Sequence, residues 1–251
     1  MTSNLEQLNT APVPEGPPDT GDQPKVALAI AAHPDDADFG CAGTAHLWSQ
    51  QGWEFYYLVC TDGSKGTDDP SLTSERLVPM RRKEQRAAAG VLGVKDVFFL
   101  EGHVDGELTY TRKLLGDVVR VIRQVKPFAV FTHEPSAVII RDSFVNHSDH
   151  RTTGLVSIDA IYPTARDRLN FPEQLEEGLE THKVKEIYIW GSEHSNFAVD
   201  ISDVVELKIQ ALLQHHSQFG EGEEFLKFVR ERWKGEDGRY TERFRRAVMF
   251  R

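Results

Sequence analysis

Residues 26–40, Val-Ala-Leu-Ala-Ile-Ala-Ala-His-Pro-Asp-Asp-Ala-Asp-Phe-Gly, join an apolar run to one histidine and three aspartates. The apolar run is typical of a strand that is buried on both faces of a parallel sheet. In an open α/β sheet, ligands usually bind where such a strand ends. Three carboxylates so close together are costly to keep ionised unless a cation neutralises them. We therefore expect a divalent metal beside His33, Asp35 and Asp36.

A second interpretation of the same residues needs no metal. Asp35, Asp36 and Asp38 could cap the helix that follows, with Pro34 marking the turn before it. A motif this short is compatible with both interpretations. The decision between them therefore depends on the rest of the chain.

The composition excludes several classes of protein. The chain has 251 residues, of which 39% are hydrophobic and 27% charged, as in ordinary globular proteins. Its formal net charge is −10 and it has no basic stripe, which argues against nucleic-acid binding and against attraction to anionic lipid. The two cysteines, Cys41 and Cys60, are too few for a disulfide framework.

The sequence also lacks the features of a membrane or secreted protein. No stretch approaches the roughly 20 apolar residues of a membrane span. Residues 1–24 contain no Lys or Arg and no apolar core, so they do not resemble a secretory signal. We therefore expect a cytoplasmic protein that acts on a small molecule and binds neither nucleic acid nor membrane. A homo-oligomer is compatible with the sequence.

Apolar runs of strand length alternate with helix-like stretches from residue 25 onward, which is the pattern of a parallel sheet with crossover helices. We expect one Rossmann-like α/β domain over residues 25–251, mostly parallel and with helices on both faces, preceded by a flexible arm over residues 1–24. The expected strands are Val26–Ala32, Glu54–Cys60, Asp96–Leu100, Phe128–Thr132 and Glu186–Trp190. The expected helices are Gly43–Gln51, Leu77–Leu92, Arg112–Val125, His150–Ile161 and Val204–Ser217. The aromatic-rich tail from Phe225 to Phe250 is expected to pack as a helix.

A second polar cluster, Asn146-His147-Ser148-Asp149-His150, follows the fourth expected strand. Right-handed crossovers would bring it to the same sheet edge as the first cluster. The i, i+3 spacing of the two histidines points both side chains the same way on a helical turn. Taken alone, the pair is more typical of a polar helix start than of metal ligands. Two such clusters at strand-to-helix junctions strengthen the metal interpretation.

The two clusters together supply a known catalytic ligand set. Catalytic zinc commonly has three protein ligands and one open position for water, and two histidines with a carboxylate form one such set. His33, Asp36 and His150 provide it, although iron or cobalt would accept the same ligands. Bound metal lowers the pKa of its water to about 7. The adjacent Asp35 is then free to act as the general base.

The remaining residues of the second cluster fit the other half of an amide hydrolysis. His147 would donate a proton to the leaving group or stabilise an oxyanion. Asp149 would orient His147 and raise its pKa, so that the ring stays protonated.

These motifs resemble those of the PIG-L/LmbE-like zinc-dependent deacetylases, which remove acyl groups from N-acetylglucosamine-type substrates. The strongest elements are Ala32-His33-Pro34-Asp35-Asp36 and His147-x-Asp149-His150. Weaker elements are Thr61-Asp62-Gly63, Arg81-Arg82-Lys83-Glu84, Leu92-Gly93-Val94, Asp105-Gly106-Glu107-Leu108 and Lys208-x-x-Ala211-Leu212 before His216-Ser217-Gln218. Ser64 and Ser148 stand where many members carry Glu and Pro.

The resemblance implies zinc on His33, Asp36 and His150, with Asp35 as the base. It also implies that His147 is an acid or oxyanion stabiliser oriented by Asp149. Arg81 resembles the family arginine that reaches toward substrate, and Arg82 is a competing choice because the arginine is doubled.

Most other candidate residues are expected to be structural. We expect His46, His103, His182 and His194 to be structural or solvated, the histidines at 215–216 to suit a helix end, and Cys41 to pack in the core. His133 follows a strand and could line the pocket. Asp38 is expected to cap the first helix.

The favoured function is therefore metal-dependent hydrolysis of an N-acyl group, most simply acetyl, from an amino sugar or related glycoconjugate. One alternative is an amidase that acts on a larger thiol conjugate or an acylated secondary metabolite. Another is a non-catalytic binding paralogue. A dinucleotide-binding module is disfavoured, because acidic residues follow the first strand where a Gly-x-Gly-x-x-Gly turn would hold a pyrophosphate.

Overall fold

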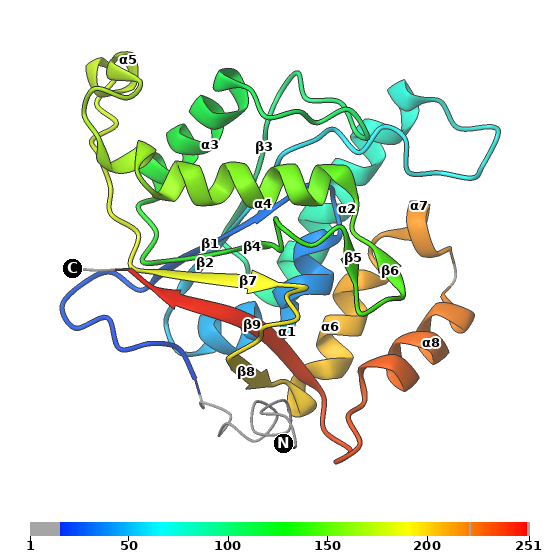
Figure 1. Ribbon diagram of the computed structural model, residues 1–251. Helices are drawn as coiled ribbons and strands as arrows, with labels where there is room; N and C mark the ends of the chain where they lie inside the picture. The colour runs from blue at the N-terminus through cyan, green and yellow to red at the C-terminus, as the bar shows by residue number, and fades with distance from the viewer. Residues whose placement is uncertain (1–15, 221, 250–251) are drawn as a thin grey trace.

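The computed structural model describes residues 16–220 and 222–249. Its central element is a seven-stranded sheet with the strand order β3-β2-β1-β4-β7-β9-β8 (Figure 1). Five strands run parallel: β1 (Val26–Ala31), β2 (Glu54–Val59), β3 (Asp96–Phe99), β4 (Ala129–His133) and β7 (Glu186–Trp190). The last two, β8 (Phe197–Asp200) and β9 (Thr241–Val248), are antiparallel to their neighbours. The expected mostly parallel α/β sheet is confirmed.

Helices cover both faces of this sheet (Figure 1). Successive residues of a strand point to opposite faces, so Ala27 and Ala29 belong to one core and Leu28 and Ile30 to the other. The first core packs against α1 (Asp36–Gln50), α2 (Ser74–Leu92) and α6 (Val205–Leu212), and the second against α3 (Arg112–Val125) and α4 (Ser148–Ile161). The small alanines of β1 leave room for the fully buried ring of Trp48.

The remaining elements are short. They are β5 (Ile139–Ile140), β6 (Phe144–Val145), α5 (Pro172–Glu176), α7 (His216–Phe219), α8 (Glu223–Trp233) and the 3-10 turns Thr164–Arg166 and Ser202–Val204. Residues 1–15 of the expected arm lie outside the described residues, and residues 16–24 contain no helix or strand.

Three parts of the sequence-based assignment differ most from the structure. The first helix begins at Asp36, seven residues before the expected Gly43, so Asp36 and Asp38 lie in its first turn. The helix expected over 204–217 is divided into α6 and α7. The C-terminal tail is helical only as far as Trp233, and its second half forms β9. Phe250 lies outside the described residues.

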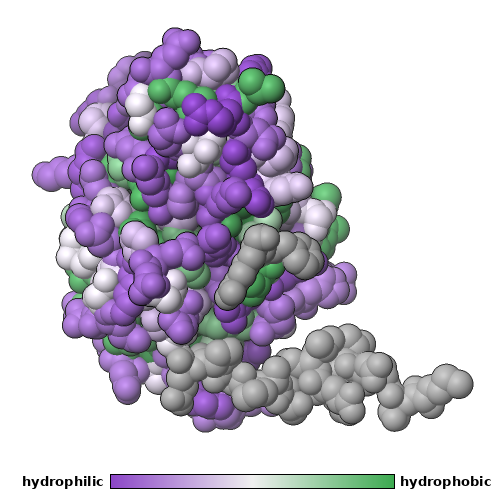
Figure 2. All heavy atoms as spheres, turned by 90° about the vertical axis from the view of Figure 1, so that its left-hand side faces the viewer, coloured by the Kyte–Doolittle hydropathy of each residue, from purple (hydrophilic) through white to green (hydrophobic). Residues whose placement is uncertain are grey.

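The surface carries polar side chains over most of the face seen in Figure 2. Among residues 16–220 and 222–249, no helix combines the length and the apolar character that a membrane crossing requires.

The strand order places β1 and β4 side by side at the centre of the sheet. The chain builds β2 and β3 on one side of β1 and then returns to form β4 on the other side. The crevice outside the carboxyl ends of two such strands is the usual ligand site of doubly wound folds. The segment after β1 and the helix after β4 therefore converge at this crevice.

Candidate active site

A tight turn links β1 to α1 and sets the directions of the first side chains. The main-chain N–H of His33 donates to Asp36 Oδ2 at 2.7 Å, which folds Asp36 back toward the strand end. Asp35, at the helix N-cap, has a φ of 98° and makes no side-chain cap hydrogen bond. Positive φ is rare for a residue with a Cβ atom and marks a strained position held by its surroundings.

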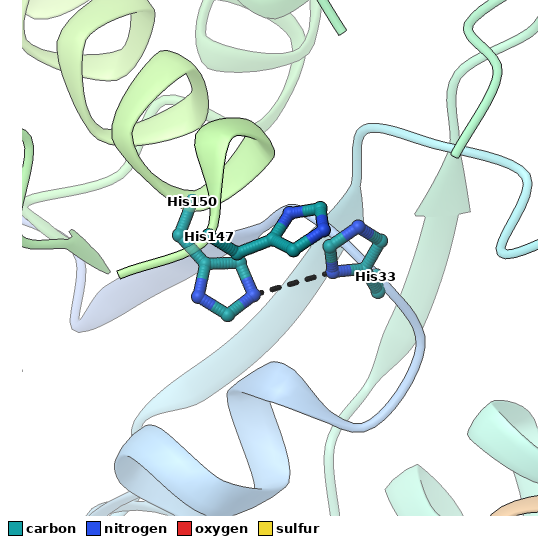
Figure 3. A group of neighbouring side chains, drawn as sticks. All are labelled: His33, His147 and His150. Atoms are coloured by element: carbon teal, nitrogen blue, oxygen red, sulfur yellow. Dashed lines mark hydrogen bonds between the residues drawn. The ribbon is translucent and has the colours of Figure 1, made fainter. Parts of the chain in front are cut away.

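The structure brings together the three expected metal ligands. His150 Nε2 lies 3.3 Å from His33 Nδ1 and 3.1 Å from Asp36 Oδ1 (Figure 3). His33 Nδ1 is also 3.3 Å from Asp36 Oδ2. His33 and Asp36 are buried, and His150 is half-buried in the first turn of α4. Two residues from one end of the chain thus meet a third that lies more than 100 positions away.

This donor set fits a divalent metal such as zinc. Zinc–nitrogen and zinc–oxygen bonds of about 2.0–2.1 Å in a tetrahedron place neighbouring ligand atoms about 3.3–3.4 Å apart, close to the separations above. Within the described residues, three overlapping groups have ligand atoms within 4.8 Å of one another: His33, His147 and His150; Asp36, His133 and His150; and His33, Asp105 and Asp149. His33 and His150 each belong to two of these groups, and Asp36 belongs to the one that also contains His150.

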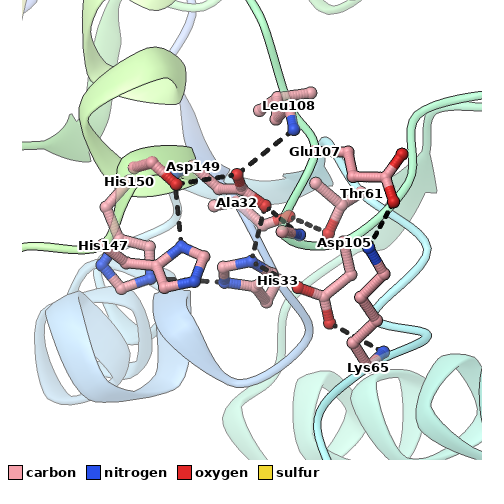
Figure 4. Close-up of polar contacts among 12 residues, drawn as sticks. Ala32, His33, Thr61, Lys65, Asp105, Glu107, Leu108, His147, Asp149 and His150 are labelled. Atoms are coloured by element: carbon pink, nitrogen blue, oxygen red, sulfur yellow. Dashed lines mark hydrogen bonds and ion pairs between the residues drawn. The ribbon is translucent and has the colours of Figure 1, made fainter.

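The second nitrogen of His33 faces two carboxylates. Its Nε2 lies 3.2 Å from Asp105 Oδ1 and 3.2 Å from Asp149 Oδ2 (Figure 4). Asp149 is fixed in turn by the main-chain N–H groups of Gly106, at 2.7 Å, and Leu108, at 3.2 Å. Burial alone would lower the pKa of His33, but Asp105, Asp149 and Asp36 raise it to about 12. This is the arrangement expected when a metal-ligating histidine is oriented by a carboxylate on its far side.

Asp105 was not among the predicted site residues, although its motif contributed to the family resemblance. Its position shows that the loop after β3 supplies part of the site.

His133 was predicted only as a pocket-lining candidate, and the structure places it directly against Asp36. Its Nε2 lies 3.3 Å from Asp36 Oδ2, and Trp190 Nε1–H donates to its Nδ1 at 3.1 Å. The main-chain N–H of Ala32 also donates to Nε2, at 3.2 Å, so both ring nitrogens of His133 are held by N–H groups from the ends of neighbouring strands. Burial lowers the pKa of His133 to about 4, so the ring is neutral at physiological pH.

Asp35 lies beside this group and pairs with Arg81. Arg81 Nη2 is 3.1 Å from Asp35 Oδ2, and the guanidinium also donates to the carbonyls of Pro34, at 2.7 Å, and Gly63, at 3.0 Å. Burial raises the pKa of Asp35 to about 6, while Arg81 opposes this shift. A carboxylate with a pKa near neutrality suits general base catalysis. Arg81 is only 3% exposed, so its contacts favour a role in holding Asp35 over direct contact with a substrate.

His147 differs from the expectation in its protonation. Its Nδ1 accepts a hydrogen bond from the main-chain N–H of Asp149 at 3.2 Å, while the Asp149 carboxylate faces His33. Burial and the neighbouring His33 lower the pKa of His147 and outweigh the opposing effect of Asp149, so the expected net rise is wrong. The exposed ring lies 5.0 Å from that of His33, centroid to centroid (Figure 3). It faces the site as a neutral ring whose Nε2 carries the proton.

Asp38 does not cap α1, which corrects a second expectation. Its carboxylate is fully buried and accepts hydrogen bonds from Gln85 Nε2 and His215 Nε2, both at 2.8 Å. His215 lies at a helix end, as expected, but there it is a buried partner of Asp38. Cys41 packs in the apolar core as expected.

The other histidines have structural contacts or lie at the surface. His46 bonds to the carbonyl of Leu92, His182 to that of Pro127, and His103 to Asp117. His194 is exposed.

The fold and this group of side chains define a hydrolase of the N-deacetylase class, and comparison with known proteins agrees. Residues 28–161 match the family model described as "PIG-L: GlcNAc-PI de-N-acetylase". The chain belongs to the PIG-L family. It is 34% identical over 197 residues to a diacetylchitobiose deacetylase of Thermococcus kodakarensis, covering 78% of this chain and 71% of that protein.

Two further relatives extend this comparison. The N,N'-diacetylchitobiose deacetylase of Pyrococcus horikoshii, solved with an inhibitor, superposes with a TM-score of 0.81 at 34% identity, covering 89% of this chain and 84% of that one. A Bacillus anthracis protein described as "Probable N-acetyl-alpha-D-glucosaminyl L-malate deacetylase 2" is 29% identical, covering 76% of this chain and 80% of that protein.

Proposed function

We propose that this chain is a metal-dependent N-deacetylase that removes the acetyl group from an N-acetylated amino sugar such as N,N'-diacetylchitobiose or N-acetylglucosamine. The observation that carries the proposal is the convergence of His33 Nδ1, His150 Nε2 and the Asp36 carboxylate at mutual distances of 3.1–3.3 Å, with Asp35 directly beside them. The similarity to deacetylases that act on N-acetylated sugars supports the choice of substrate class.

His33, Asp36 and His150 would hold the metal, and zinc is the metal we favour over iron or cobalt. When bound, the metal would make a water molecule acidic enough to supply hydroxide near neutral pH. Asp105 and Asp149 orient His33 through its Nε2, and His133 does the same for Asp36. Rigid partners of this kind keep ligands in place.

Asp35 would act as the general base that accepts the proton of the attacking water. Its burial keeps its pKa near neutrality, and the ion pair with Arg81 prevents the pKa from rising further. His147 would donate a hydrogen bond from Nε2 to the oxygen or nitrogen of the scissile amide. Asp149 positions that ring through its main-chain N–H. Arg81 contributes to the site by fixing Asp35.

The experiment combines metal content with acetate release. Purified protein is expected to bind one metal per chain and to release acetate from N,N'-diacetylchitobiose or N-acetylglucosamine. His33→Ala should lose the metal, whereas Asp35→Asn should keep the metal and lose activity. His194→Ala, which changes an exposed histidine, is the matched control and should change neither.

Two outcomes would contradict the proposal. Full activity of Asp35→Asn would show that Asp35 is not the base. Cleavage of bulky thiol-conjugate amides without release of acetate from either sugar would assign the chain to the amidases instead.

A further inference from the structure

Gln85, on the face of α2 that meets the β1–α1 turn, makes two hydrogen bonds that the proposed reaction does not itself require. Its Oε1 accepts from the main-chain N–H of Asp35 at 2.7 Å. Its Nε2 donates to Asp38 Oδ2 at 2.8 Å. The residue is fully buried, so neither bond is replaced by water. Because an N–H can only donate and a carboxylate can only accept, the two partners fix the orientation of the Gln85 amide.

Arg81 and Gln85 together hold both ends of one peptide group. Arg81 Nη2 donates to the carbonyl of Pro34 at 2.7 Å, and Gln85 accepts from the N–H of the next residue, Asp35. The two side chains are four residues apart on α2 and therefore lie on the same helix face. A peptide held at its oxygen and at its hydrogen cannot rotate without breaking one of these bonds.

The clamped peptide is the one whose rotation would move Asp35. The φ of Asp35 is 98°, a value that side chains with a Cβ atom adopt only when the surroundings compensate for the strain. Relaxation toward a negative φ would swing the Asp35 carboxylate away from the group formed by His33 and Asp36. The hydrogen bond from Asp35 to Gln85 opposes that relaxation.

Gln85 is itself held by a buried pair formed by Asp38, in the first turn of α1, and His215, between α6 and α7. Asp38 Oδ2 also accepts from His215 Nε2 at 2.8 Å, and both residues are 0% exposed. The neighbouring Glu84 accepts from the N–H and the hydroxyl of Ser217, at 2.9 and 2.6 Å, which ties α7 to the same turn of α2. The hydrogen bonds that hold the peptide between Pro34 and Asp35 are therefore backed by buried contacts of α2 with residues outside the candidate metal site.

We propose that Gln85 is a positioning residue for the reaction, because it holds the strained main chain of Asp35 so that its carboxylate faces the metal group. The inference rests on the proposed role of Asp35 as the base. It assigns to Gln85 no contact with substrate.

The test uses Gln85→Met, which keeps a side chain of similar length but removes both hydrogen bonds. Amide hydrogen exchange at Asp35, followed by NMR, should become at least about tenfold faster because its acceptor is lost. The kcat for N,N'-diacetylchitobiose should fall about 10- to 100-fold, with KM within about twofold and one metal still bound per chain. Lys83→Met, on the exposed face of the same helix, is the matched control and should change none of these quantities.

Gln85→Glu separates positioning from a general loss of packing. A protonated Glu can accept from Asp35 N–H and donate to Asp38, so this variant should keep slow exchange at Asp35 and recover most of the kcat. Unchanged exchange in Gln85→Met, or faster exchange with an unchanged kcat, would overturn the inference. If the wild-type protein releases no acetate, the proposed function fails, whereas the exchange measurement still decides whether Gln85 holds Asp35.

Discussion

Gly154 lies where α4 comes closest to β4, and replacing it with Ala should damage both stability and activity. A Cβ atom at this position would lie 2.4 Å from the carbonyl oxygen of His133 and 3.2 Å from Pro135 Cβ. Ordinary contacts of a Cβ atom begin at 3.4 Å, so α4 would have to withdraw from β4 by 3.4 − 2.4 = 1.0 Å. The nearest obstacle is main chain of the sheet, which cannot rotate away as a side chain can.

The magnitude combines two opposing terms. Overpacking of a well-packed core costs about 1–3 kcal/mol, and Gly→Ala in a helix returns up to about 1 kcal/mol through helix propensity. We therefore expect Gly154→Ala to lower the free energy of unfolding by about 1–2 kcal/mol. His150 lies one turn earlier on the same face of α4. A displacement of this size in a catalytic group costs about 100-fold in rate, which is the loss expected in kcat/KM.

Gly90→Ala provides a control with the same chemical change. Gly90 lies in α2, is exposed, and has no atom within 4 Å of the position that a Cβ would occupy. This variant should raise the free energy of unfolding by about 0.5–1 kcal/mol and leave activity unchanged. Both variants are measured by urea unfolding and by acetate release. If the two behave alike, close approach of α4 to β4 does not position His150, and the reasoning is refuted.

Two further predictions concern stability away from the site. Arg123 is fully buried and its guanidinium donates to five main-chain carbonyls of the connection after α4, so Arg123→Met should cost about 2–3 kcal/mol in urea unfolding. Arg120→Met, which breaks only an exposed ion pair with Glu177, should cost less than about 1 kcal/mol, and equal losses would contradict the account. Burial lowers the pKa of His182 below its ordinary value of 6.5; the unfolded chain therefore binds a proton that the folded chain does not, and stability falls as the pH drops through that value. His182→Gln, which keeps a donor for the carbonyl of Pro127, should reduce the loss of stability between about pH 7.5 and about pH 5.5, and identical pH profiles would rule out this contribution.

The sequence was sufficient to predict the parallel strands and the meeting of the two polar clusters, because both depend on local patterns and general topology. A buried strand has an uninterrupted apolar run, and the carboxyl ends of parallel strands share one sheet edge. His33 and His150 follow from these two facts once β1 and β4 are neighbours, as the structure shows.

The contacts that depend on distant partners could not be predicted in this way. Asp149 is two residues from His147 in sequence, yet its carboxylate turns to His33, 116 residues away. Asp38 similarly pairs with His215, 177 residues away. The strand β9 was missed for a related reason. One of its buried positions is Glu242, which pairs with Lys208, so the charged side chain interrupts the apolar alternation that would have indicated a strand.

The electrostatic cost of the aspartates after β1 is met in two different ways. Asp35 lies 3.1 Å from an arginine, and Asp38 lies 2.8 Å from a buried histidine whose pKa is raised by that carboxylate despite its burial, so the protein itself supplies their counter-charges. Asp36 faces imidazole rings, and two further carboxylates approach the far nitrogen of His33. Around His33 three carboxylates, those of Asp36, Asp105 and Asp149, lie within 3.3 Å of one imidazole ring, and the nearest arginine nitrogen is 3.8 Å from Asp105. A divalent cation would therefore stabilise this group more than any other part of the acidic cluster, and of the three aspartates after β1 only Asp36 would bind it.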